Sequence, residues 1–122
     1  MTNISLTLTP KLRLKRALKK AGVEDPASVT KLTVSGTFTD DDFRYIREKM
    51  AKTLNELDMS NATVEGIFSL HGCEGLISIS IPASVESICT TAFEDCEYLS
   101  EVTVHPDNPV YASENNVMFQ QG

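Results

Sequence analysis

The chain has 122 residues, enough for one domain with a buried core. Hydrophobic residues make up 41% and charged residues 23%, and no run approaches the ~18 consecutive apolar residues of a membrane-spanning helix. Six of the 11 basic residues fall within positions 11–20, so the rest of the chain is strongly acidic. We therefore expect no nucleic-acid partner and no membrane span.

Residues 1–30 are predicted to form an N-terminal cap. Met1 to Thr9 alternate polar and apolar side chains and lack the apolar core of a signal peptide, so no signal peptide is expected in this chain. A helix is predicted to follow, capped by Thr9, with Pro10 at its first position and Gly22 just past its end. Its basic residues are interpreted as a solvated face or as partners of the acidic surface. An anionic membrane surface or nucleic acid is the less favoured alternative.

From residue 29 onward one pattern recurs four times: an aliphatic residue, two variable positions, and two aliphatic residues separated by one position. Its first positions are Val29, Leu54, Leu76 and Leu99, which are 25, 22 and 23 residues apart. These spacings fall in the range of roughly 20–29 residues that is typical of leucine-rich repeats. Four copies exceed the roughly three that a stable stack needs.

The alternation within each copy predicts a strand with one buried face. Because one such strand cannot bury that face alone, neighbouring copies are predicted to stack in parallel, about 4.8 Å apart. The buried ladder is then Leu32/Val34, Leu57/Met59, Ile79/Ile81 and Val102/Val104. The alternating side chains form an open sheet face, which is the candidate partner-binding site: Lys31, Thr33, Glu56, Asp58, Ser78, Ser80, Glu101, Thr103 and His105.

The segments between the copies change character along the chain. A helix is predicted after Thr39, because Thr39 and Asp42 approximate a capping box and Asp40 to Asp42 suit its positive end. A calcium site is the alternative for these acids, but the spacing of an EF-hand loop is missing. Between the last two copies, Pro82 is predicted to end a strand, and residues 91–94 are predicted to form only a short helical turn.

The second half of the chain resembles a known family. Residues 76–88 resemble the L-x-x-I-x-I-P-x-S-V-x-x-I core of the BspA-like leucine-rich repeat, and residues 92–99 resemble its A-F-x-x-C-x-x-L continuation. Residues 105–119 resemble the N-P-x-Y segment that follows in these proteins, and residues 28–66 resemble their lead-in. The resemblance implies a secreted or cell-surface bacterial protein, with adhesion as the role of some members and no shared catalytic residues.

Together these observations predict a single α/β domain over residues 1–122: a right-handed leucine-rich-repeat solenoid with a short parallel sheet and N-terminal helices as cap. Residues 31–66 are interpreted as a divergent first repeat and residues 67–122 as BspA-like repeats. The predicted function is a non-enzymatic, extracellular module for protein–protein interaction or adhesion. The alternative is a structural end piece of a larger solenoid, or a module that associates with itself.

The cysteines are interpreted as structural, and no nucleophile–base pair is expected around His71 or His105. Cys73 and Cys96 lie 23 residues apart at equivalent positions, where a small apolar side chain suits a tight turn. Closely spaced cysteine pairs of the zinc-binding kind are missing. We therefore expect no catalytic residues, no metal and no cofactor. The remote alternative is a thiol- or metal-dependent enzyme built on Cys73, Cys89 and Cys96.

Overall fold

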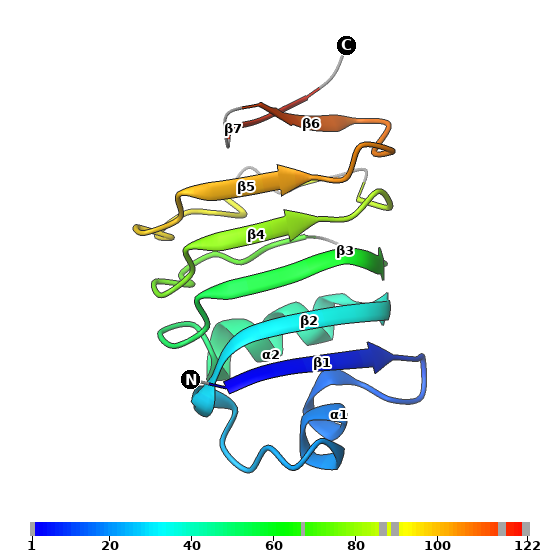
Figure 1. The fold of residues 1–122 in the computed structure, drawn as a ribbon, viewed down its shortest axis with the longest axis vertical. Coiled ribbons are helices and arrows are strands. Elements are labelled where there is room, and N and C mark those ends of the chain that lie inside the picture. Colours follow the sequence, from blue (N-terminus) through cyan, green and yellow to red (C-terminus); the bar gives the residue numbers. More distant parts are fainter. Residues whose placement is uncertain (1, 67, 86–87, 89–90, 115–116, 121–122) are drawn as a thin grey trace.

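The chain forms an α/β structure around one parallel sheet (Figure 1). The computed structural model describes residues 2–66, 68–85, 88, 91–114 and 117–120. Its elements are β1 (Thr2–Leu8), α1 (Leu14–Lys20), a short 3-10 helix (Pro26–Ser28), β2 (Val29–Phe38), α2 (Asp40–Lys49), β3 (Glu56–Val64), β4 (Ser78–Ile81), β5 (Glu101–Val104), β6 (Tyr111–Glu114) and β7 (Val117–Gln120).

Strands β1 to β5 form the sheet, and every neighbouring pair is parallel. Their order in the sheet is their order in the chain (Figure 1). Strands β6 and β7 pair antiparallel with each other and lie beyond β5. The predicted α/β class and the predicted parallel sheet are therefore confirmed.

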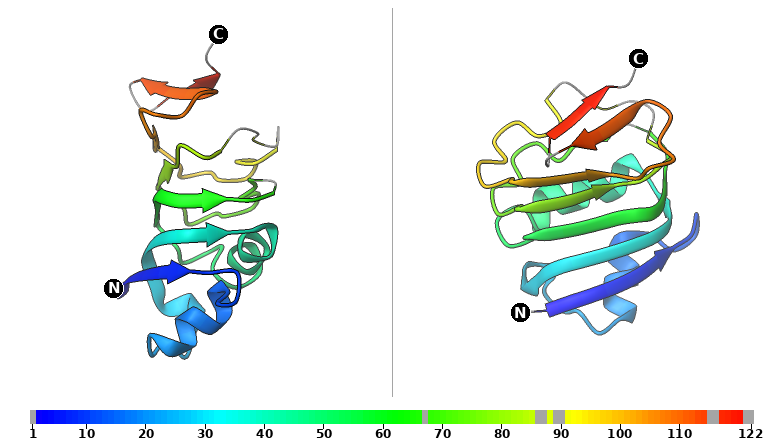
Figure 2. Two further views of the ribbon diagram at one scale, coloured as in Figure 1. Left: turned by 90° about the vertical axis from the view of Figure 1, so that its right-hand side faces the viewer. Right: turned by 45° about the horizontal axis from the view of Figure 1, so that its top comes forward.

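The two helices occupy different places. Helix α2 lies behind β2 and β3, on one face of the sheet, whereas α1 lies beyond β1 (Figure 1, Figure 2). Within the described part of the chain, no helix covers the opposite face. None of the described helices is long and apolar enough to cross a membrane.

The N-terminal segment contains a strand that the sequence analysis missed. Strand β1 pairs with β2 from Asn3 opposite Lys31 to Leu8 opposite Gly36. Its alternating side chains place the buried Leu8 and the partly buried Ile4 and Leu6 toward the core. The sheet therefore begins inside residues 1–30, which were predicted to contribute only a helical cap.

The first helix also starts later than predicted. Residues 9–12 form a tight turn closed by the Thr9–Leu12 bridge, and Leu12 N donates a hydrogen bond to Thr9 Oγ1 at 3.1 Å. Helix α1 begins only at Leu14, with Arg13 at its N-cap position. The prediction that Thr9 caps the helix is wrong because the chain must first turn away from the end of β1.

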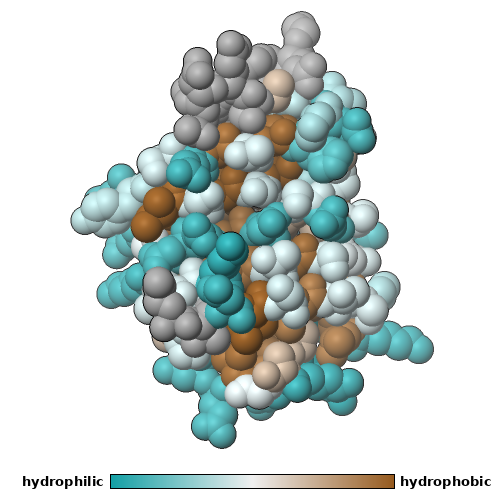
Figure 3. Space-filling model, in the orientation of Figure 1, coloured by the Kyte–Doolittle hydropathy of each residue, from teal (hydrophilic) through white to brown (hydrophobic). Residues whose placement is uncertain are grey.

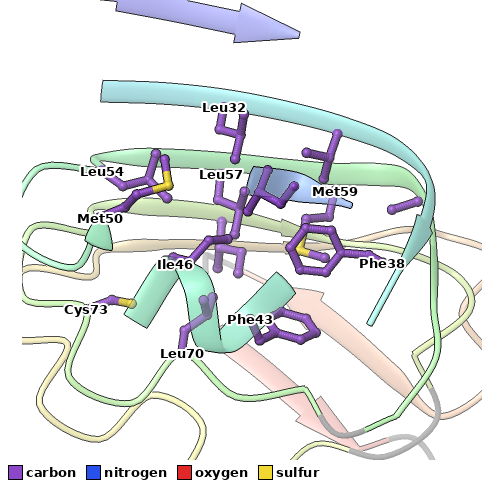
Figure 4. Packing of buried hydrophobic residues seen from close by; sticks show 14 of the residues in the cluster. Leu32, Phe38, Phe43, Ile46, Met50, Leu54, Leu57, Met59, Leu70 and Cys73 are labelled. Atoms are coloured by element: carbon purple, nitrogen blue, oxygen red, sulfur yellow. The ribbon is translucent and has the colours of Figure 1, made fainter. Parts of the chain in front are cut away.

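The core lies between the sheet and the segments behind it. Leu32, Leu57, Ile79 and Val102 stand directly opposite one another on successive strands. The first three are fully buried and Val102 is half-buried. Figure 4 shows Leu32 and Leu57 pointing from their strands toward Ile46 of α2. This aliphatic ladder matches the predicted one.

Helix α2 forms because its first turn is well capped. Thr39 is the N-cap residue, and its backbone N–H donates to Asp42 Oδ2 at 2.9 Å, as the capping-box prediction required. Phe43 and Ile46 face the core and are buried, as is Met50 at the C-cap.

A row of four phenylalanines runs through the structure behind the sheet. The ring centroids of Phe38 and Phe43 lie 4.7 Å apart, those of Phe43 and Phe68 lie 4.9 Å apart, and those of Phe68 and Phe93 lie 5.8 Å apart. All three contacts are edge-to-face, an arrangement that aromatic quadrupoles favour. The row ties α2 to the two connections that follow β3 and β4.

Asn108 anchors the segment after β5 to the rest of the chain. It is buried, and its Nδ2 donates to Pro82 O at 3.0 Å and to Val85 O at 2.9 Å. Its Oδ1 accepts from the backbone N–H groups of Val110 and Tyr111, each at 2.8 Å. Asn108, the first residue of the N-P-x-Y segment noted in the sequence, therefore ties the chain after β5 to the connection between β4 and β5.

Candidate functional site

The open face of the sheet carries two straight rows of side chains because parallel pairing places equivalent residues side by side. The first row contains Asn3, Lys31, Glu56, Ser78 and Glu101. The second row contains Ser5, Thr33, Asp58, Ser80 and Thr103. Eight of the nine predicted face residues are thus brought together on one surface.

His105 is the ninth predicted residue, and it lies past the end of β5. Its backbone N–H donates to Ile81 O at 2.9 Å, and its Nδ1 accepts from the backbone N–H of Asp107 at 3.0 Å. This second hydrogen bond directs the ring into the turn that follows β5. His105 therefore borders the face without belonging to either row.

Two residues of the face were missed because β1 was missed. Asn3 and Ser5 extend the rows by one strand, and both side chains are exposed. The signal was available, since residues 2–8 show the same two-residue alternation as the later strands.

Charge on the open face is predominantly acidic. Lys31 is the one base in the two rows, and its Nζ lies 3.6 Å from Glu56 Oε2. Both partners are about half exposed, so the pair contributes little to stability. Asp58 Oδ1 accepts hydrogen bonds from Ser60 N at 3.0 Å and from Ser60 Oγ at 2.7 Å. Lys31 offsets the charge of Glu56 only. Asp58 and Glu101 therefore leave the face with a net negative charge.

An irregularity in the pairing of β2 with β3 shapes the middle of this face. Thr33 lies opposite Asp58, whereas Ser35 lies opposite Asn61, so β3 contains one extra residue there. Such a bulge bends its strand and re-aims nearby side chains. The two hydrogen bonds from Ser60 hold the Asp58 carboxylate at this point.

Two open hollows mark the face. One, of about 110 Å³, lies on the strands and is lined by Lys31, Glu56, Leu57, Asp58, Ser78 and Ser80. The other, of about 340 Å³, lies where the strands begin and is lined by Asn3, Thr30, Lys31, Asn55, Glu56 and Ile77. Figure 3 views this side and shows hydrophilic and weakly polar residues over the strands, with hydrophobic ones visible between them. Ile77 supplies an exposed apolar side chain at the edge.

The thiols have the surroundings of packing residues. Cys73 is buried, and burial is the main cause that raises the pKa of its thiol to about 12. Burial is also the largest cause that raises the pKa of Cys96, whose Sγ donates to Leu70 O at 3.3 Å. Protonated thiols are poor nucleophiles and poor metal ligands. Cys89, the third cysteine in the alternative of a thiol- or metal-dependent enzyme, lies outside the described residues.

The basic run of residues 11–20 divides into two parts. Lys15, Arg16, Lys19 and Lys20 are exposed on α1, as a solvated helix face requires. Arg13 instead turns inward, and its Nη1 lies 3.0 Å from Oδ2 of the buried Asp42. Arg13 therefore pairs with an acid of this chain, which is one of the two interpretations given for the basic run.

No protein-family model matches this chain, and a search of curated proteins found no relative.

Proposed function

We propose that the chain is a right-handed leucine-rich-repeat solenoid of the BspA-like kind, and that it binds a protein partner through its open sheet face. Support comes from the order of β1 to β5, which follows the chain and keeps every pair parallel. Solenoids add one such unit at a time, so that each contacts only its neighbours. The contacts of Asn108 give a physical role to one residue of the segment that resembles this family.

The observation that carries the proposed function is the uncovered face with its two aligned rows. A sheet face left without a helix layer is a surface that solenoids use for recognition. Its Ser and Thr hydroxyls supply both donors and acceptors, and its acids at Glu56, Asp58 and Glu101 outnumber Lys31. A partner surface rich in Lys or Arg complements this pattern.

The proposed role is an interaction or adhesion module that acts outside the cell and performs no chemistry on its partner. The protonated state of the Cys73 and Cys96 thiols agrees with a role that uses no thiol nucleophile. Surface biotinylation of intact cells that express the chain from its own gene tests the location. Labelling only after lysis contradicts it.

Capture experiments with a charge-reversed variant test the face. The chain is immobilised and exposed to host-matrix and bacterial-envelope fractions, and each captured protein is purified and its Kd measured. The variant Glu56→Lys/Asp58→Lys/Glu101→Lys is expected to bind the captured protein at least about tenfold more weakly than the wild type. The loss is expected to be largest at low salt, where surface charges are least screened. Its matched control, Glu24→Lys/Glu48→Lys/Glu74→Lys, makes the same change in net charge at exposed residues outside the two rows.

Equal losses in the two triple variants would show a general charge effect and contradict a site on the face. Light scattering on the purified chain addresses the self-association alternative separately. A dimer that the charge-reversed variant dissociates would assign the face to a second copy of this chain.

A further inference from the structure

A second cluster of polar side chains lies in the connections between strands. His71 belongs to the connection from β3 to β4, and Glu94 lies 23 residues later, in the connection from β4 to β5. Two backbone hydrogen bonds hold these turns side by side: Leu70 N to Ala92 O and Gly72 N to Glu94 O, each at 2.8 Å. The positions of the two turns are therefore fixed by the backbone.

Three side-chain ligand atoms converge where the turns meet. His71 Nε2 lies 3.5 Å from Asp95 Oδ2 and 4.0 Å from Glu94 Oε1. One ligand atom from each of the three residues lies within 4.8 Å of the others. Ligand atoms around a tetrahedral zinc ion lie roughly 3.3–3.5 Å apart. A small movement of these exposed side chains closes the set around an ion.

The backbone at Asp95 explains why a carboxylate reaches this point. Asp95 has a φ of 64°, and among the described residues it is the one non-glycine with a positive φ. Its counterpart 23 residues earlier is Gly72, with a φ of 78°. Aspartate and asparagine tolerate this left-handed conformation better than most residues. The second turn thus keeps the shape of the first and adds a carboxylate beside His71.

We propose that His71, Glu94 and Asp95 bind a divalent transition-metal ion of the zinc class. A neutral imidazole with two carboxylates suits Zn²⁺, Co²⁺ or Ni²⁺, whereas Mg²⁺ and Ca²⁺ prefer sites made of oxygen alone. The ion's two charges offset the repulsion between the adjacent carboxylates of Glu94 and Asp95. Because all three side chains are exposed, the remaining coordination positions are open to water or to a donor from another molecule.

This site is separate from the open sheet face and does not rest on its proposed function. Leu70 and Cys73, which flank His71 in the chain, lie on the far side of the core from Leu32 of β2 (Figure 4). No metal was expected from the sequence. Cysteine spacing carries no signal for this site, because His71 and Glu94 are brought together by the backbone hydrogen bonds between their two turns.

Calorimetric titration of the chelator-treated full chain with ZnCl₂ tests the proposal. We expect one ion per chain and at least about tenfold weaker binding in both His71→Ala and Asp95→Asn. Asp95→Asn removes the charge and keeps a residue that tolerates the left-handed turn. The matched control is His105→Ala, which removes a histidine 4.0 Å from another carboxylate, that of Asp107, and is expected to leave binding unchanged.

The cobalt spectrum distinguishes this site from binding by the cysteines. Co²⁺ is expected to bind without the near-ultraviolet absorption that thiolate ligands produce, and Mg²⁺ is expected not to displace it. A thiolate band, an absence of binding heat, or equal affinity in the wild type and Asp95→Asn would each overturn the proposal. Far-ultraviolet circular dichroism of each variant confirms that the fold is retained.

Discussion

The guanidinium of Arg13 and the carboxylate of Asp42 form an ion pair that joins the two helices, with Nη1 3.0 Å from Oδ2. The same carboxylate accepts from Leu14 N at 3.0 Å and from Thr39 N at 2.9 Å. Asp42 therefore caps α1 and α2 together, and it is almost fully buried. Arg13 Nη2 also donates to Thr37 O at 3.0 Å, which links the pair to the end of β2.

Replacing Asp42 with alanine is expected to destabilise the fold by about 3 kcal/mol, because it removes the anionic partner of a partly buried guanidinium and the acceptor of two backbone N–H groups. Urea unfolding measures the free energy. The adjacent Asp41→Ala is the control, since the Asp41 side chain is 77% exposed and its loss is expected to cost less than about 0.5 kcal/mol. Equal costs for the two variants would contradict the double-cap role.

Asn108→Ala is expected to cost about 2–3 kcal/mol, because four hydrogen bonds to buried or half-buried backbone groups are lost together. Thermal unfolding followed by circular dichroism measures the loss. Asp107→Ala, one residue earlier and exposed, serves as the comparison. An unchanged Tm for Asn108→Ala would show that the segment after β5 is not anchored by this residue.

Two glycines with similar backbone angles are expected to respond differently to alanine. Gly22 and Gly36 have φ values of 88° and 81°, so a β-carbon strains both by roughly 1–2 kcal/mol. At Gly36 that carbon would also lie 2.0 Å from Leu8 O of β1, whereas at Gly22 it meets nothing within 4 Å. Gly36→Ala is therefore expected to cost about 1–3 kcal/mol more in urea unfolding. Equal costs would argue against close pairing of β1 with β2.

The unfolding free energy is expected to fall between about pH 9 and pH 12 through Cys73. Its pKa rises from 9.0 to about 12 on folding, so in this window the unfolded chain has lost the proton that the folded chain retains. The loss amounts to about 1.4 kcal/mol per pH unit and is absent below pH 9. Urea unfolding at several pH values compares wild type with Cys73→Ala, which is expected to show the shallower decline. Parallel pH profiles would contradict the burial of this thiol.

Much of the sheet was predictable because its signal is local and repeated. The two-residue alternation in each copy, together with the spacing of the copies, located β2 to β5 and the ladder of Leu32, Leu57, Ile79 and Val102. Strand β1 was missed because its alternation was used only to reject a signal peptide. The start of α1 was misplaced because its cap, Asp42, lies 29 residues from Arg13 and was assigned only to its own helix.

The candidate face was predictable to the same extent as the strands that carry it. Period-two alternation assigned eight residues to the correct side without a structure. His105 was placed on the face by continuing the alternation past the end of β5, where the chain already turns. The cluster of His71, Glu94 and Asp95 depends on the alignment of two turns, which strand patterns do not report.

Methyl NOE spectroscopy on the selectively labelled chain tests the central claim most directly, namely that successive copies stack in parallel and leave one face open. The structure predicts NOEs between Leu32 and Leu57, between Leu57 and Ile79, and between Ile79 and Val102. No direct NOE is expected between Leu32 and Val102, which are three strands apart. Finding those neighbouring contacts absent, or finding backbone NOEs of antiparallel pairing between β2 and β3, would contradict both the stacked architecture and the proposed binding face that depends on it.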